Sequence, residues 1–176
     1  GDYHPMSPTR LDATMRLVRE LGLDTAAVMQ RVRDERDRFV QHTAQAVDAW
    51  PRCTLIKGRA RFTGTHRLLV DDRTVTADRF VVATGAVARV PQDWREKLGD
   101  RMVTSDAVFD WAVLPHAVAV VGAGSIGLEL AQALHRLGVR VRVFERGRTL
   151  GPLTDPAVQA EAERLLGAEL DLRLGA

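Results

Sequence analysis

Three glycines at the spacing G-x-G-x-x-G, Gly122, Gly124 and Gly127, constrain the fold of this chain more than any other feature. An apolar run precedes them, which predicts a buried strand over 118–121, and residues 128–137 continue as an amphipathic helix. In such a unit the first glycine permits a tight turn, the second lets a pyrophosphate approach the backbone, and the third lets helix and strand pack closely. The alternative interpretation is a glycine-rich turn in an ordinary α/β unit.

The residues around the glycines extend this prediction. Phosphate oxygens would accept from free backbone N–H groups at the helix N-terminus, which includes Ser125 and Ile126. A second predicted strand, 139–144, ends in Glu145, roughly 20 residues past the glycines, where a carboxylate accepts from both ribose hydroxyls of NAD. A helix over 155–166 and a strand over 170–174 complete a predicted β-α-β-α-β unit that begins near His116.

Composition limits the other functions open to the chain. Of its 176 residues, 45% are hydrophobic and 27% charged, which is typical of a packed globular protein. The net charge of +2 gives no sign of nucleic-acid binding, and no apolar stretch approaches the ~18 residues of a membrane span. The N-terminus does not resemble a signal peptide, and we predict no metal site. The single cysteine, Cys53, is predicted to be buried or half-buried and without a catalytic role, so a cytoplasmic location is the simplest interpretation.

The first half of the chain changes character near residue 51. A short helix is predicted over 10–21, and a longer one begins at the N-cap Asp24 and is stopped near Trp50 by Pro51. Short β runs follow at 59–62, 66–70 and 74–76, with a more buried strand at 79–83. Residues 86–115 contain scattered prolines and a short amphipathic piece over 93–98, which indicates a segment that crosses between two units.

Three features in this order resemble the pyridine nucleotide-disulfide oxidoreductases. They are the meander 57–64, the run 77–85 and the glycine motif with Glu129. The long helix before the meander resembles the dihydrolipoamide dehydrogenase and mercuric reductase branch. The resemblance implies an α/β fold in which residues 1–115 are part of an FAD-binding domain and residues 116–176 the first half of an NAD-binding domain. Within the first part it implies a helical piece (1–51), a meander (52–85) and a crossing segment (86–115).

The resemblance also implies roles for individual residues. Glu129 matches a glutamate that lies between nicotinamide and flavin. Glu145 matches the ribose-binding acid, whose charge repels a 2′-phosphate and favours NAD over NADP, although Arg146 and Arg148 lie close by. The residues that would bind FAD are Ala83, Thr84 and Gly85, and those that would bind NAD are Gly122, Gly124, Ser125, Ile126, Gly127 and Glu145.

The sequence departs from this family at the sites of its chemistry. A first flavin-binding glycine motif and the redox pair C-x-x-x-x-C are both absent; one alignment places Met6 and Arg10 where a redox cysteine and a lysine would stand. We therefore expect a central fragment of an FAD-dependent, NAD(H)-linked disulfide oxidoreductase, inactive alone. Two alternatives are a non-catalytic dinucleotide-binding or interaction module, and a flavin NADH oxidase or transhydrogenase without the disulfide. The expected partners are the remainder of the flavoenzyme and further copies of the chain. In a fragment, the surfaces that the rest of the protein would cover leave apolar faces exposed.

Overall fold

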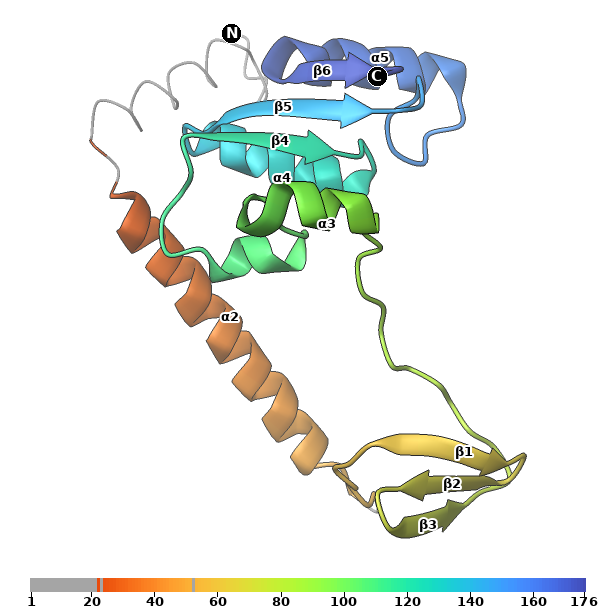
Figure 1. The fold of residues 1–176 in the computed structure, drawn as a ribbon. Coiled ribbons are helices and arrows are strands. Elements are labelled where there is room, and N and C mark those ends of the chain that lie inside the picture. The colour runs from red at the N-terminus through yellow and green to blue at the C-terminus, as the bar shows by residue number, and fades with distance from the viewer. Residues whose placement is uncertain (1–21, 23, 52) are drawn as a thin grey trace, which may run out of the picture.

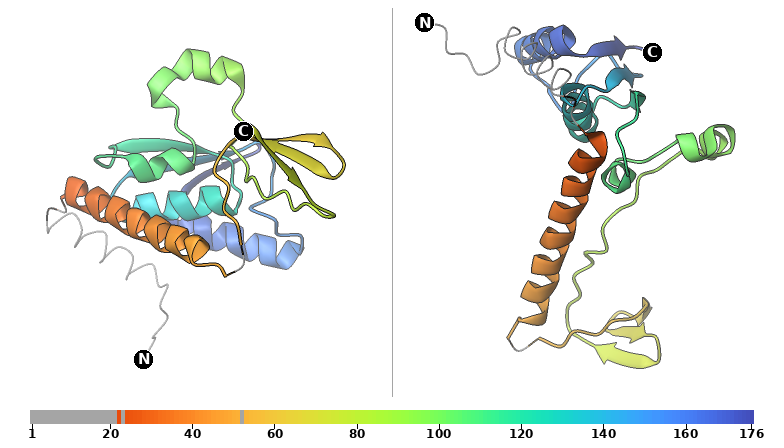
Figure 2. Two further views of the ribbon diagram at one scale, coloured as in Figure 1. Left: turned by 90° about the horizontal axis from the view of Figure 1, so that it is seen from below. Right: turned by 90° about the vertical axis from the view of Figure 1, so that its left-hand side faces the viewer.

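A computed structural model describes residue 22, residues 24–51 and residues 53–176. The helix predicted over 10–21 lies outside the described residues, as do Met6 and Arg10. The described residues form a long helix, an antiparallel meander and a β-α-β-α-β unit, so the predicted fold class is confirmed (Figure 1). The right-hand view of Figure 2 shows the meander apart from the parallel sheet, with the long helix and the extended segment 77–91 running between the two.

The long helix, α2, spans Thr25–Asp48. Asp24 caps it as predicted, because its side chain accepts from the backbone N–H of Ala26 at 2.9 Å. α2 buries only Met29; Phe39 of this helix and Trp50, just past its end, are both exposed.

Two arginines fix the first half of α2 to a segment that follows in the chain. Arg33 donates to the backbone carbonyl of Trp111, while Arg36 donates to the carbonyl of Phe109 at 3.2 Å and pairs with Asp110. These partners lie in or just after the 3-10 helix η2, Asp106–Asp110, which the sequence had not indicated. Trp111 packs against the core of the β-α-β-α-β unit, so these contacts connect α2 to that core.

Cys53 is exposed, so the prediction of a buried or half-buried cysteine is wrong. The reason is local: residues 53–59 form no helix or strand that could carry the side chain onto a core.

The meander consists of β1 (Ala60–Gly64), β2 (Arg67–Val70) and β3 (Arg73–Thr76), paired antiparallel in that order. Its register places Phe62, Leu68 and Val75 in one cross-strand row, next to the buried Val70. Side chains alternate between the two faces of a strand, so this face is apolar and the other is mainly polar. Phe80 packs edge-on against Phe62, with the ring centres 5.3 Å apart.

The strand predicted over 79–83 is not formed, and this expectation is wrong. Residues 77–91 are extended but pair with no strand in the described part of the chain, and Val81 is 93% exposed. An apolar run becomes a strand only where a neighbouring strand accepts its backbone hydrogen bonds, and here no such strand is supplied. The short helix α3, Gln92–Leu98, follows close to its predicted position and leads into the 3-10 helix η1, Gly99–Arg101.

The last third of the chain forms the predicted parallel unit. It contains β4 (Ala117–Val121), α4 (Ser125–Arg136), β5 (Arg140–Glu145), α5 (Pro156–Glu169) and β6 (Asp171–Leu174). The strand order is β4-β5-β6, with every pair parallel.

Both helices cover the same face of this sheet. Val141 and Val143 of β5 are buried in a core that includes Leu134 of α4, and Leu166 of α5 packs against it. Arg140 and Arg142, which alternate with these valines, are exposed on the opposite face. Arg142 pairs there with Asp171 of β6 at 2.5 Å.

β4 is less buried than its apolar sequence predicts, which corrects the expectation of a buried strand. Its residues alternate between exposed and half-buried, and Val121 is 61% exposed. The cause is its position: β4 pairs only with β5, so its outer edge and one of its faces have no neighbour among the described residues.

Candidate functional site at the end of β4

The glycine-rich loop joins the carboxyl end of β4 to α4. Gly122 has a φ of +109°, a conformation that favours glycine, and its N–H donates to the carbonyl of Phe144 at 2.8 Å. The chain can therefore turn sharply while it remains attached to β5. The turn that the first glycine was predicted to permit is present.

The start of α4 presents free hydrogen-bond donors. Gly124 is the N-cap, and a side chain there would meet no atom within 4 Å. The backbone N–H groups of residues 125–127 donate to no acceptor in the part of the chain that the structure describes, as expected in a first helical turn. These donors and the positive end of the helix dipole give Ser125 and Ile126 the properties of an anion-binding turn.

Gly127 lies where α4 crosses the end of β4. A Cβ built on it would overlap the backbone carbonyl oxygen of Gly122 and would lie 3.6 Å from Cγ1 of Val120. Only a residue without a side chain allows this close approach, as predicted for the third glycine.

Glu145 ends β5 beside this loop. One carboxylate oxygen accepts from the N–H of Ala123 and the other from the N–H of Gly147, both at 2.8 Å. These backbone donors, that of Ala123 first, hold the pKa of the Glu145 carboxyl below its ordinary value against the opposing effect of burial, and Arg146 lowers it further. The side chain is therefore an anion at neutral pH.

The other predicted site residues are not all brought to this loop. Glu129 is exposed in the first turns of α4, three residues after the exposed Ile126, so both lie on one side of the helix. Ala83, Thr84 and Gly85 are exposed in the extended segment between β3 and α3, outside the β-α-β-α-β unit (Figure 1). The structure thus places the glycines beside Glu145 and leaves the proposed flavin residues in a separate segment.

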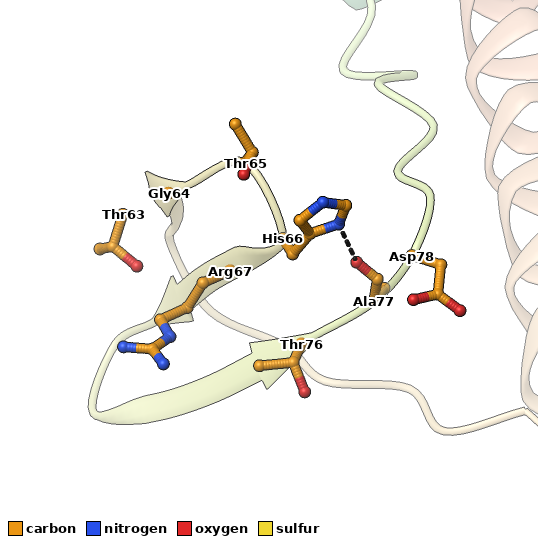
Figure 3. A pocket seen from close by; sticks show the side chains of 8 residues that line it. All are labelled: Thr63, Gly64, Thr65, His66, Arg67, Thr76, Ala77 and Asp78. Carbon is orange, nitrogen blue, oxygen red and sulfur yellow. Dashed lines mark hydrogen bonds between the residues drawn. The ribbon is translucent and has the colours of Figure 1, made fainter.

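Two features near the proposed sites were missed from the sequence. The first is a set of backbone contacts after β5, which includes Gly151 N–H to the carbonyl of Ala123 at 2.7 Å; no side-chain pattern indicates such bonds. The second is an open hollow at the end of the meander (Figure 3). There His66 Nδ1 lies 3.2 Å from the carbonyl oxygen of Ala77, next to Asp78.

Comparison with known proteins identifies the family. Residues 13–176 match the pyridine nucleotide-disulphide oxidoreductase family, so the chain belongs to it. The chain is 34% identical over 113 residues to a mercuric reductase of Lysinibacillus sphaericus, with 64% of this chain and 20% of that protein covered. It is 37% identical over 113 residues to a soluble pyridine nucleotide transhydrogenase of Mycobacterium tuberculosis, with 61% and 24% covered. A glutathione reductase of Burkholderia cepacia is 35% identical over 122 residues, with 69% and 26% covered.

A solved structure supports the fold. The HOCl-induced flavoprotein disulfide reductase RclA from Escherichia coli, in its Cu(II) complex, superimposes with a TM-score of 0.72 at 22% identity. The match covers 94% of this chain and 38% of that one. The chain spans only about a fifth to a quarter of the length of the curated relatives it matches. Among the described helices, none combines the length and the apolar character needed to cross a membrane.

Proposed function

We propose that this chain is the central part of an FAD-dependent, NAD(H)-linked disulfide oxidoreductase that resembles dihydrolipoamide dehydrogenase. In this proposal residues 116–176 hold NAD(H), and the complete protein passes hydride between nicotinamide and flavin. The observation that carries the proposal is the position of Glu145, whose carboxylate lies beside the loop that contains Gly122, Gly124 and Gly127. That combination is the arrangement that binds a dinucleotide in a β-α-β unit.

The residues of the loop fit NAD. The open space at Gly124 leaves room for a pyrophosphate, and the free N–H groups of residues 125–127 would donate to its oxygens. Each carboxylate oxygen of Glu145 has a second lone pair, so the side chain can accept from ribose hydroxyls while it keeps its backbone partners.

We expect the chain to bind NADH more tightly than NADPH. The ionised Glu145 repels a 2′-phosphate, while Arg146 follows it directly. Calorimetric titration of the chain with each nucleotide at neutral pH measures the two dissociation constants. Equal or tighter binding of NADPH would contradict the expectation. It would indicate that Arg146 and Arg148 bind the 2′-phosphate of the ribose.

FAD belongs to the complete protein in this proposal. When bound, the flavin supplies the two-electron chemistry that no side chain can supply. Ala83, Thr84 and Gly85 would hold it, and Glu129 would lie where nicotinamide and flavin meet. This chain contributes only part of that site, and its single cysteine excludes an internal redox pair. The second candidate is a non-catalytic dinucleotide-binding module, in which the same glycine-rich loop would bind the nucleotide.

We propose that the remainder of the flavoenzyme covers the exposed apolar surfaces, and that the chain alone pairs with further copies. The outer edge of β4 is unpaired in the described part of the chain, and Val81 and Val87 are more than 90% exposed. Unpaired edges and apolar patches favour association. Light scattering over a concentration series should therefore show a mass that rises with concentration, whereas a monodisperse monomer throughout would exclude this.

A further inference from the structure

Ala123, the residue between the first two glycines, is hydrogen-bonded on both sides, to the last residue of β5 and to the segment that follows β5. It is 1% exposed, its N–H donates to Glu145, and its carbonyl accepts from the N–H of Gly151 at 2.7 Å. The neighbouring Gly122 N–H donates to Phe144. The backbone of the glycine-rich loop is therefore connected to residues 144–151 through three groups of two consecutive residues, Gly122 and Ala123.

Glu145 connects this arrangement to the last strand of the sheet. Its second oxygen binds the N–H of Gly147, and the carbonyl of Gly147 accepts from the N–H of Gly175, just past β6, at 2.8 Å. The backbone carbonyl of Glu145 itself accepts from the N–H of Ala176 at 3.1 Å. One side chain therefore joins the loop after β4 to a turn that is itself attached to the end of β6.

We propose that Glu145 is a positioning residue that fixes the backbone of the glycine-rich loop for pyrophosphate binding, in addition to any contact with ribose. Hydrogen bonds from a backbone N–H to a carboxylate are among the stronger ones in proteins, because the acceptor is charged. The loop must present its N–H groups in one conformation to bind phosphate, and the Ala123 contact restricts that conformation. The proposal rests on the proposed function for its consequence on binding, whereas the contacts that form the restraint lie within the chain itself.

The ligand that separates the two roles is an NADH analogue without the 2′- and 3′-hydroxyls of the adenosine ribose. If Glu145 acted only through those hydroxyls, Glu145→Gln would leave binding of the analogue unchanged, or tighten it by removing a negative charge near the phosphates. If Glu145 positions the loop, the substitution weakens binding of the analogue about ten-fold, because glutamine offers one acceptor oxygen in place of two charged ones. Glu161→Gln, an exposed carboxylate of α5 that pairs with Arg164, is the matched control and should change nothing.

Amide signals in the nucleotide-free chain test the restraint directly. In the wild type, the amide protons of Ala123 and Gly147 should shift together as pH falls through the lowered pKa of Glu145. Of the charged side chains, Arg146 acts on the Glu145 carboxyl. Arg148 follows two residues later, with its side chain close to Gly175. Hydrogen exchange at the Ala123 amide should be about ten-fold faster in Glu145→Gln.

The outcomes distinguish this proposal from the proposed function. An unchanged rate of hydrogen exchange at the Ala123 amide in Glu145→Gln would overturn the positioning role even if NADH binds. Wild-type amide signals of Ala123 and Gly147 that do not change with pH would overturn it as well. Analogue binding that is unchanged or tighter in Glu145→Gln would also overturn it. If the wild type binds no nucleotide while the amide results are as expected, the restraint stands and the nucleotide-binding function fails.

Discussion

Replacing Gly127 by alanine is expected to destabilise the chain and to abolish most of its nucleotide binding. The added Cβ would overlap the carbonyl oxygen of Gly122, a backbone atom that cannot rotate away, so the start of α4 must move off β4. Such overpacking costs more than the gain in helix propensity from alanine, and we expect a net loss of about 2 kcal/mol in the free energy of unfolding. Urea denaturation measures this loss, and calorimetry should show NADH affinity reduced more than ten-fold.

Gly167 provides the matched control for this substitution. It lies in α5, and a Cβ there would meet no atom within 4 Å. Gly167→Ala should therefore stabilise the chain by up to about 1 kcal/mol through helix propensity alone. If both variants were stabilised alike, α4 and the end of β4 would not approach each other as described.

Replacing Leu150 by alanine is expected to cost about 3 kcal/mol of unfolding free energy, within the range for fully buried leucines. Leu150 is completely buried against the core of the β-α-β-α-β unit, although it lies in the connection after β5. The next residue, Gly151, binds the carbonyl of Ala123, so nucleotide affinity should fall as well. Chemical denaturation and calorimetry measure the two effects.

Leu165 is the control for this loss. It is 49% exposed on α5, and Leu165→Ala should cost less than about 1 kcal/mol, with unchanged NADH affinity. Equal destabilisation by the two substitutions would mean that the connection after β5 does not contribute to the core.

Much of the parallel unit could be predicted because its signals are local. The glycine spacing, the alternation of valine and arginine in β5 and the pattern of the helix over 155–166 each depend on residues that are close in sequence. The turn at Gly122 and the close approach at Gly127 follow from the same pattern. The acid that ends β5 was placed correctly as well, because parallel strands bring their carboxyl ends to one edge of the sheet.

The errors arise where structure depends on neighbours that a sequence pattern does not specify. Among the residues that the structure describes, the apolar run 79–83 has no partner strand and β4 has none on its outer edge, so both are more exposed than their composition predicts. Cys53 is exposed as well, since residues 53–59 form no helix or strand that carries its side chain onto a core. The contacts of Glu145 with Ala123 and Gly147 involve backbone N–H groups, which carry no residue-specific signal.

The most direct test of the central claim is a titration of the isotope-labelled chain with NADH, followed by NMR. The claim that the loop after β4 binds the dinucleotide predicts that amide signals of residues 122–127 and 145–148 shift with added NADH. Signals of the meander, residues 60–76, should stay in place. Shifts confined to the meander, or no shift at millimolar NADH, would contradict the claim.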